Sequence, residues 1–241
     1  MRRVNTPVIT IKTIMMIPKC LRYAAGFVIA AMTASQGAII VLDFEGLGDQ
    51  EPVENFYDGG FGGNGSGPGT DFDITFSSNS LAIIDADAGG SGNFGGEPSP
   101  DTILFFLSGA AATLNAPNGF DTGFSLFYTS PDGPASVDVY DGLNATGNLL
   151  ASLALPTTPD NGAPDPSGRF SPFEPFGVAF TGTALSVDFG GAANFVGFDD
   201  ITFGSATPGG GPPSSVPDGG STLTLFAIAL FGLVLRKQAA K

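Results

Sequence analysis

The stretch Ala184-Leu-Ser-Val-Asp-Phe189 alternates apolar and polar residues, so that its leucine, valine and phenylalanine share one phase and its serine and aspartate share the other. A period of two is that of a β-strand with one face packed and the other in water. The segment 103–108 begins instead with five consecutive apolar residues, which predicts a central strand covered on both sides. Both patterns indicate a protein built from β-sheets.

Short segments rich in Phe, Val and Ile continue in both directions, separated by Gly, Pro, Asn and Asp. The many Phe side chains need a large buried layer, which two packed sheets provide. We therefore predict an all-β domain over residues 38–204, a two-sheet antiparallel β-sandwich that is jelly-roll-like, with an immunoglobulin-like sandwich as the alternative. Its strands are predicted at 38–44, 72–76, 81–85, 103–108, 124–128, 136–140, 149–155, 176–181, 184–189 and 195–203.

Three long segments between these strands are expected to be loops. Residues 59–70 and 88–100 are rich in Gly and Ser, and residues 157–172 are rich in Pro and Asp. Loops of this length are either functional or mobile, and their glycine content favours mobility. Residues 205–215 are a Pro, Gly and Ser linker that follows the domain.

The N-terminal residues 1–37 have the pattern of a secretory signal peptide. Five basic residues precede an apolar segment at 23–32, and small residues follow it. This order predicts a signal helix that is removed on export. The single cysteine, Cys20, lies before the apolar segment, so the exported chain is expected to have no thiol.

The C-terminal residues 216–241 carry a second targeting pattern. A short turn-forming motif precedes a continuous apolar run of 13 residues, Leu223 to Leu235, which the basic Arg236 and Lys237 follow. Thirteen residues of helix cover about two-thirds of a bilayer's hydrocarbon core. The run therefore predicts a short hydrophobic helix in transient contact with the membrane, and Arg236 and Lys237 are the predicted stop-transfer residues.

In these residues the chain resembles the PEP-CTERM class of bacterial sorting signals, most closely the variant with the motif Val-Pro-Asp-Ser-Gly. Gly219 stands where that variant usually has serine. The resemblance implies cleavage near the motif by an exosortase-type enzyme, and a destination at the cell envelope, the cell surface or the extracellular matrix of a bacterium. The alternative is an ordinary C-terminal membrane anchor. The predicted sorting motif comprises Val216, Pro217, Asp218, Gly219, Gly220 and Ser221.

Charge separates the two ends from the domain between them. Of the nine Lys and Arg residues, Arg169 is the only one between positions 38 and 217, where 22 of the 23 Asp and Glu residues lie. One base and 22 acids give this part of the chain a formal charge of −21. Such a surface repels nucleic-acid phosphates, so nucleic acid is excluded as a partner. Most of the carboxylates are expected only to keep the exported protein soluble.

The domain also has no His, Cys or Trp. Imidazole and thiolate catalysis and the usual nitrogen and sulfur ligands of zinc are therefore excluded. The enzyme class that remains is a secreted carbohydrate-active hydrolase that uses two carboxylates. We predict a non-enzymatic protein, because most of the acids lie in Gly-rich turns, and keep the hydrolase as the alternative.

Carboxylates occur on both the first and the last predicted strand: Asp43 and Glu45 on the first, Asp199 and Asp200 on the last. These strands are often neighbours in a sandwich, so the four side chains are expected to meet. The alternation of the last strand changes phase at Asp199 and Asp200, which predicts a β-bulge or an inward-facing Asp199. A buried carboxylate needs a partner, and calcium accepts about six to eight oxygen ligands, so the four residues are the candidate metal site.

This arrangement is similar to that of jelly-roll carbohydrate-binding modules that hold a structural calcium between their terminal strands, which implies calcium as a cofactor and polysaccharide as a ligand. The alternative is that Asp199 and Asp200 end a strand and face water. A second set of acids is expected to be a solvated strand face: Asp71, Asp73, Asp85 and Asp87.

Three aromatic residues are candidate ligand contacts. Tyr140 is expected to face away from Val137 and Val139, as a platform for a sugar ring would. Phe61 and Phe94 lie in the Gly-rich loops, where they are expected to close over the sandwich or to contact a partner. The sequence therefore predicts an exported β-sandwich of the surface or matrix that is cleaved at its C-terminal signal and binds polysaccharide with a structural calcium.

Overall fold

The computed structural model describes residues 38–160 and 168–210, all of which belong to one compact unit, residues 35–219. The predicted signal helix, sorting motif and C-terminal hydrophobic helix lie outside the described residues. Within the described ranges, no helix has the length and apolar character needed to cross a membrane. One 3-10 turn, η2 (Pro208–Gly210), is the only helical element of this part of the chain.

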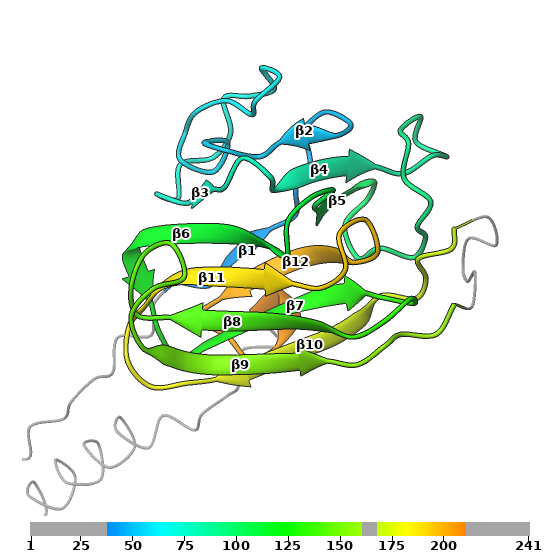
Figure 1. The fold of residues 1–241 in the computed structure, drawn as a ribbon. Coiled ribbons are helices and arrows are strands. Elements are labelled where there is room, and N and C mark those ends of the chain that lie inside the picture. The colour runs from blue at the N-terminus through cyan, green and yellow to red at the C-terminus, as the bar shows by residue number, and fades with distance from the viewer. Residues whose placement is uncertain (1–37, 161–167, 211–241) are drawn as a thin grey trace, which may run out of the picture. The chain divides into compact units, whose positions relative to one another are not determined.

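Two antiparallel sheets face each other (Figure 1). The seven-stranded sheet has the order β10-β7-β12-β5-β4-β2, and β1 also pairs with β12. The five-stranded sheet has the order β3-β6-β11-β8-β9. The strands of the first sheet are β1 (Ile40–Leu42), β2 (Glu51–Pro52), β4 (Leu81–Ile84), β5 (Thr102–Phe105), β7 (Gly123–Thr129), β10 (Glu174–Ala179) and β12 (Gly197–Phe203). Those of the second are β3 (Thr75–Phe76), β6 (Ala111–Phe120), β8 (Ala135–Tyr140), β9 (Leu149–Leu155) and β11 (Ala184–Gly190).

The layer between the sheets is rich in phenylalanine. Phe124, Phe189 and Phe198 are fully buried there, and Phe203 is 2% exposed. Their rings meet at an angle, with 5.6 Å between the centroids of Phe124 and Phe203 and 5.2 Å between those of Phe189 and Phe198. Tilted and edge-on contacts are the favoured geometry of aromatic pairs. The two-sheet antiparallel sandwich predicted from the sequence is confirmed.

Each of the ten predicted strand segments contains or overlaps an observed strand, but β2 and β6 were not predicted. In β6 the residues Ala112, Leu114 and Ala116 are buried and alternate with half-buried ones, so the strand period is present. Its second half contains Pro117, which opposes strand formation. The proline lies where the register between β6 and β11 is irregular. No backbone hydrogen bond between the two strands is therefore lost because proline has no N–H.

The expected alternation of the segment 184–189 is partly confirmed. Val187 and Phe189 are buried in the core, and Asp188 is half-buried on the other face. Leu185 is only half-buried, because the register with β6 shifts between Ala184 and Ser186. Ser186 is fully buried instead. Its burial is tolerated because its hydroxyl donates a hydrogen bond to the carbonyl of Gly142 at 2.5 Å.

The glycine-rich segment 59–70 is arranged around a buried carboxylate. Glu51 of β2 is fully buried, and its Oε1 accepts hydrogen bonds from the backbone N–H of Asn64 (2.8 Å) and of Ser66 (3.0 Å). Its Oε2 accepts from the N–H of Gly48 at 2.6 Å. Burial alone would raise the pKa of Glu51, but the hydrogen bonds outweigh it and the pKa is lowered. A Cβ at Gly62 would lie 2.6 Å from Glu51 Oε1, so glycine is needed for this close approach.

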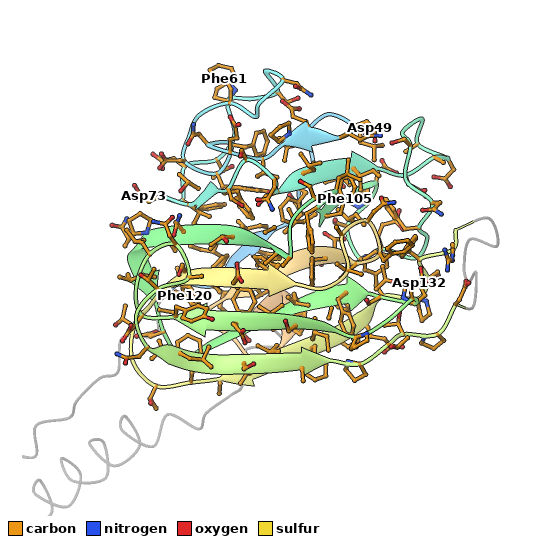
Figure 2. All side chains as sticks on the ribbon, in the orientation of Figure 1. Asp49, Phe61, Asp73, Phe105, Phe120 and Asp132 are labelled. Atoms are coloured by element: carbon orange, nitrogen blue, oxygen red, sulfur yellow. The ribbon has the colours of Figure 1, made fainter. Side chains whose placement is uncertain are left out.

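The second glycine-rich segment, 88–100, packs on the seven-stranded sheet. Phe94 is 2% exposed and forms a small cluster with Ile103 of β5 and with Phe173, whose ring it meets edge-on at 6.2 Å. Phe94 therefore closes over the sandwich, which is the first of its two expected roles. Phe61, by contrast, is 55% exposed in the loop above β2 (Figure 2).

Arg169, the only base among the described residues, lies beside this cluster. Its guanidinium is paired with Asp132, lies 3.7 Å from a carboxylate oxygen of Asp160, and sits over the ring of Phe170 at 5.8 Å from the centroid. Part of the predicted loop 157–172 lies outside the described residues.

After β12 the chain stays on the sandwich for several residues. Ser125 donates its hydroxyl proton to the carbonyl of Ser205 (2.9 Å), and Gly209 donates its N–H to Thr202 Oγ1 (3.0 Å). The first half of the predicted linker therefore has defined contacts with the domain.

Candidate functional site

A pocket of about 450 Å³ opens at one end of the sandwich. The end of β6 contributes Asn118 and Phe120, the segment before β3 contributes Phe72 and Asp73, and Thr183 precedes β11. Asp73 and Phe120 lie at the same end of the domain, which is the end opposite Asp132 (Figure 2). The antiparallel pairing of β6 with β11 explains this grouping, because it sets Phe120 opposite Ala184, next to Thr183.

Phe72 and Phe120 contribute their rings to the apolar part of the pocket, and the core behind holds both rings in place. Ile40, Ile74 and Phe203 line the same part. Phe120 meets Phe203 edge-on with 4.8 Å between the centroids, and it meets Phe180 at 5.7 Å. Phe72 stacks on Tyr57 at 6.4 Å. Both pocket rings are half-buried. Rings fixed in this way present a preformed apolar surface to a ligand.

The rim of the pocket is polar. Asn118 donates from Nδ2 to Asp73 Oδ2 at 2.5 Å, and both side chains are exposed. Asp121 and Thr183 are also exposed at the pocket. The rim therefore offers an amide, a hydroxyl and two carboxylates to a ligand that lies on the rings.

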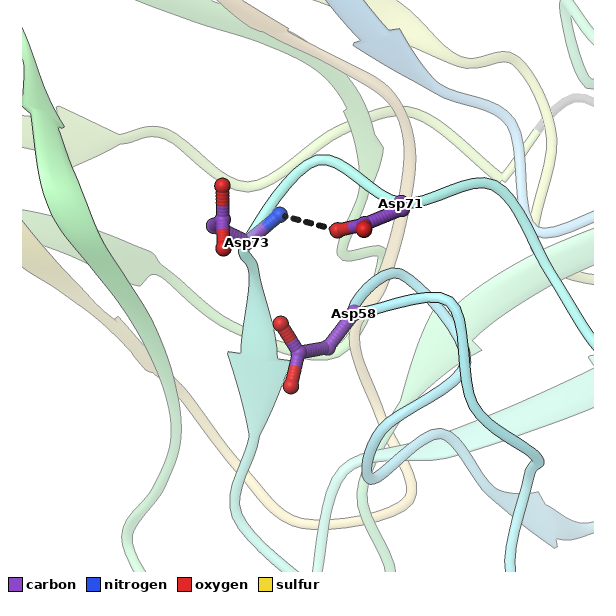
Figure 3. Close-up of side chains that lie close together, drawn as sticks. All are labelled: Asp58, Asp71 and Asp73. Atoms are coloured by element: carbon purple, nitrogen blue, oxygen red, sulfur yellow. Dashed lines mark hydrogen bonds between the residues drawn. The ribbon is translucent and has the colours of Figure 1, made fainter.

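Asp73 also belongs to a group of three exposed acids beside the pocket (Figure 3). One oxygen from each of Asp58, Asp71 and Asp73 lies within 4.8 Å of the others. The expectation of a strand face for Asp71 and Asp73 is wrong: Asp73 has φ of 55° and donates its N–H to Asp71 Oδ1 (3.2 Å), so the two form a turn before β3. Exposed acids often lie this close without an ion, so proximity alone does not make a metal site.

The other two acids of the second predicted set lie elsewhere. Asp85 is 3% exposed and its Oδ1 accepts the N–H of Ala86 at 2.6 Å. Asp87 is exposed in the turn that follows. Burial raises the pKa of the neighbouring Glu97 to about 7, and the charges of Asp85, Asp87 and Asp101 add to that rise.

The predicted meeting of the terminal strands is observed. β1 pairs antiparallel with β12, from Ile40 opposite Phe203 to Leu42 opposite Ile201. The predicted bulge is present as well, because the register between β12 and β7 shifts between Asp199 and Thr202. Asp200 accommodates the extra residue of the bulge, and its backbone φ is 47°.

Asp199 points inward and is fully buried. Its partner is Ser99, which donates its N–H to Asp199 Oδ2 at 3.1 Å and places its hydroxyl 2.8 Å from both carboxyl oxygens. The N–H of Asp200 donates to Oδ1 at 2.7 Å. Burial raises the pKa of Asp199 to about 8; the hydrogen bonds from Ser99 oppose the rise and the charge of Asp200 adds to it. The carboxyl is therefore protonated over most of the range from pH 4 to 8.

The other three predicted calcium ligands have separate environments. Glu45 Oε1 accepts the N–H groups of Asp101 and Thr102, each at 2.9 Å, and so holds the start of β5. Asp43 is exposed, and Asp200 is half-buried with a pKa raised by burial and by the charge of Asp43. No three of the four predicted ligands place oxygens within 4.8 Å of one another. An ion at this position would have to replace Ser99 on Asp199, and the calcium site stays a prediction.

Sequence reasoning did not identify the pocket. Phe72 and Phe120 lie within or beside strand patterns that indicate only core packing, and Asp58 joins Asp71 through a single isolated β-bridge. Tyr140 was a candidate, and it is half-buried on the outer face of β8 while Val137 and Val139 are buried, as expected.

Comparison with known proteins identifies the C-terminal segment. Residues 215–237 match the model of the VPDSG-CTERM motif. The chain carries a sorting signal of the PEP-CTERM type. The VPDSG-CTERM motif contains the predicted residues Val216 to Ser221 and the basic Arg236 and Lys237, and such a motif indicates export, surface anchoring and processing by an exosortase. A search of curated protein sequences finds no match to the chain.

Solved structures with a similar arrangement of strands include three carbohydrate-related proteins. A family 43 arabinoxylan arabinofuranohydrolase from Bacillus subtilis is 20% identical over 54% of this chain, at a TM-score of 0.35, and the match spans only 25% of that enzyme. The module CBM6cm-2 of Cellvibrio mixtus lichenase 5A is 13% identical, with 52% of this chain and 86% of the module covered and a TM-score of 0.30. TmCBM61, solved with β-1,4-galactotriose, is 13% identical, with 64% and 98% covered and a TM-score of 0.34.

Proposed function

We propose that the sandwich is a non-enzymatic, exported binding module for extracellular polysaccharide, and that the pocket between Phe72 and Phe120 is its saccharide site. The observation that carries the proposal is the pocket itself. Its volume of about 450 Å³ falls within the range of about 300–1,000 Å³ that is typical of small-molecule sites. It combines two fixed aromatic rings with a polar rim, as such sites do.

This combination matches the chemistry of a sugar ring. A pyranose has an apolar face of C–H groups, which packs on an aromatic ring, and an edge of hydroxyls, which hydrogen-bond to amides and carboxylates. Asn118, Asp121 and Thr183 are exposed at the rim for that purpose. Asp73 and Asp121 make the rim negative, so a neutral polysaccharide is favoured over one that carries uronic acid or sulfate groups.

The VPDSG-CTERM motif supports the same function from the other end of the chain. A module held at the cell surface, or released into the extracellular matrix after cleavage by an exosortase, is placed where polysaccharide is the abundant ligand. The alternative of a hydrolase needs two carboxylates that reach one substrate. Glu97, whose pKa is raised to about 7, is half-buried but does not line the pocket. Asp199, whose pKa suits a proton donor, is fully buried and out of reach of a substrate.

Calcium at Asp43, Glu45, Asp199 and Asp200 is the second part of the proposal. Asp43 and Glu45 follow β1, and Asp199 and Asp200 lie on its partner strand β12. An ion that binds only the folded state raises its stability. Calcium is expected to raise the melting temperature, and Asp199→Asn is expected to abolish the rise. If calcium still raises the melting temperature of Asp199→Asn but does not raise that of Asp71→Asn, the ion binds the exposed acids instead.

A glycan array of neutral and acidic polysaccharides tests the saccharide site, with the protein purified from the cells that export it. The array is run with calcium and with a chelator. Wild-type protein is expected to bind neutral glycans, and Asn118→Ala is expected to weaken binding about tenfold, the equivalent of one hydrogen bond. Phe120→Leu keeps an apolar side chain of smaller volume, removes the ring face and is expected to act in the same direction.

Phe195→Leu is the matched control. Phe195 is 39% exposed, but it lies after the C-terminal end of β11, whereas Thr183 of the pocket lies before the N-terminal end. Absence of glycan binding by the wild type, or an equal loss in the Phe195 variant, would contradict the proposal.

A further inference from the structure

The two sheets end in edge strands of different kinds. The seven-stranded sheet ends in β10 and β2, and the five-stranded sheet ends in β3 and β9. An edge strand presents unpaired N–H and C=O groups that can pair with another chain, and proteins block such edges with charges, prolines, bulges or short strands. These four end strands can be compared on that basis; β1, which among the described residues pairs only with β12, is a fifth edge and has only three residues.

Three of the four end strands are blocked. β2 and β3 have two residues each, and the carbonyl of Pro52 in β2 already accepts the N–H of Gly63 at 2.7 Å. β10 begins with Glu174 and Pro175, both exposed, so it combines a charge with a residue that has no N–H.

β9 is the exception. It reads Leu149-Leu-Ala-Ser-Leu-Ala-Leu155 and contains no charge, no proline and no glycine over seven residues. Among the described residues, β8 is the one strand that pairs with it, so the other side of β9 has no partner strand. The register with β8 is irregular at Leu149, which bends that end, and is regular from Ala151 to Leu155. Within the part of the chain that the structure describes, these five residues are regular and have hydrogen-bonded strand partners only in β8; β10 of the other sheet lies close to β9 but does not pair with it.

The distribution of charge says what can approach this edge. The chain between positions 38 and 217 has 22 acids and one base, so two copies repel each other wherever carboxylates face. An uncharged strand is the place where two such polyanions can make contact with the least repulsion. The same argument disfavours an acidic peptide, and a basic partner would gain nothing from an uncharged edge.

We propose that β9 pairs with β9 of a second copy of this chain, in antiparallel orientation about a twofold axis at Leu153. A twofold interface uses the same patch on both copies and closes on itself. In this register Ala151 faces Leu155 of the second copy and Ser152 faces Ala154. The pairing joins the two five-stranded sheets into one continuous sheet, with Leu153 of each copy on its buried face.

The dimer is a weak one in solution. Pairing of five residues buries little area, which is the range of transient contacts. The association strengthens with salt, because the Debye length falls from about 10 Å at about 0.1 M to about 3 Å at about 1 M and screens the repulsion between the copies. Copies held side by side on a surface meet at a high effective concentration, where a weak contact is occupied.

Sedimentation equilibrium of the protein purified from the cells that export it tests the proposal, over a wide range of protein and salt concentrations. We expect a monomer–dimer equilibrium that shifts toward dimer as salt rises. The double substitution Ser152→Glu and Ala154→Glu places like charges opposite each other and is expected to weaken the dimer about tenfold or more. Both side chains are exposed, but Ser152 lies opposite Asp138 of β8, so the melting temperature is measured to check that the variant keeps its fold.

Ala179→Glu, at an exposed position of the β10 edge, is the matched control and leaves the dimer unchanged. Hydrogen exchange adds a second measurement: the outward amides of residues 151–155 exchange more slowly as the wild-type concentration rises, and do not in the β9 variant. A monomer under all conditions, a dimer that weakens with salt, or a dimer unaffected by the β9 substitutions would overturn the proposal.

Discussion

Asp199 shows how a single buried carboxyl is hydrogen-bonded by groups of the protein. The Ser99 hydroxyl has one proton, but its oxygen lies 2.8 Å from both carboxyl oxygens and 3.0 Å from the carbonyl of Asp43. If Asp199 carries a proton, it donates to Ser99 Oγ while Ser99 donates to Asp43, and every group is paired. This proton count agrees with the raised pKa of about 8. The inward Asp199 could be predicted from the phase change in its strand, but Ser99 could not, because 100 residues separate the two.

The pKa of Asp199 predicts a specific dependence of stability on pH. The pKa rises from 3.8 in the unfolded chain to about 8 in the folded one, so the folded state binds the proton more tightly. This contribution is present below pH 3.8 and is lost as pH rises through 8, at about 1.4 kcal/mol per pH unit. In Asp199→Asn one backbone N–H loses its acceptor, so near about pH 5 the variant is less stable than wild type by about 1–3 kcal/mol.

The stability gap between Asp199→Asn and wild type is expected to narrow as pH rises from about 5, to close between about pH 6 and about pH 7, and to reverse above that, because wild type alone loses about 1.4 kcal/mol per pH unit. Urea unfolding across the pH range measures it. Asp58→Asn, at an exposed acid of the group beside the pocket, serves as the control for the loss of one carboxylate. An Asp199→Asn variant with an unchanged slope would disprove the assignment.

At the scale of elements, the strands were more predictable than the loops. Ten strand segments could be predicted from alternation and apolar runs, because every second side chain of a strand in a sandwich faces the core. β6 was not predicted, because small alanine side chains make up much of its alternation and the alternation ends at Pro117. The loop 59–70 was expected to be mobile from its glycine content, whereas the structure shows its N–H groups directed at Glu51. A carboxylate outside the loop defines the loop's shape, and local composition contains no sign of it.

Glu51→Gln tests that reading of the loop. A glutamine offers one acceptor oxygen where the carboxylate offers two, and its NH₂ group faces an N–H donor. At least one of the backbone N–H groups at positions 48, 64 and 66 then loses its partner. We expect the free energy of unfolding to fall by about 1–3 kcal/mol and the loop 59–70 to become more sensitive to protease.

Denaturant unfolding and limited proteolysis measure the two effects. Glu54→Gln is the control, since Glu54 is only half-buried and lies three residues away. Equal effects of the two substitutions would show that Glu51 has no special role.

At the scale of the whole molecule, the sequence divides into an acidic domain and two basic-flanked apolar ends. Composition alone revealed this division, and the match to the VPDSG-CTERM motif confirms the C-terminal signal. The pocket between Phe72 and Phe120 could not be predicted in the same way. Its residues come from the segment before β3, the end of β6 and the residue before β11, which only the pairing of these strands brings together.

Deletion of residues 216–241 tests the role of the signal. Without the motif, the apolar run and the basic stop, the exosortase has no substrate and the membrane no contact, so the protein is expected to leave the cell envelope for the medium. Fractionation of cells and medium followed by immunoblotting measures it. Replacement of Pro212 and Pro213 by alanine, upstream of the matched residues, should leave the distribution unchanged. Retention of the deleted form in the envelope would contradict this role.

The scarcity of basic residues has a consequence for survival outside the cell. Proteases that cleave after Lys or Arg find one target between positions 38 and 217, the bond that follows Arg169. That arginine is engaged by Asp132, Asp160 and the ring of Phe170. Even a cut there leaves β10 paired with β7, and β11 and β12 paired with strands from the other fragment. A trypsin-like enzyme would therefore nick the sandwich without releasing either half.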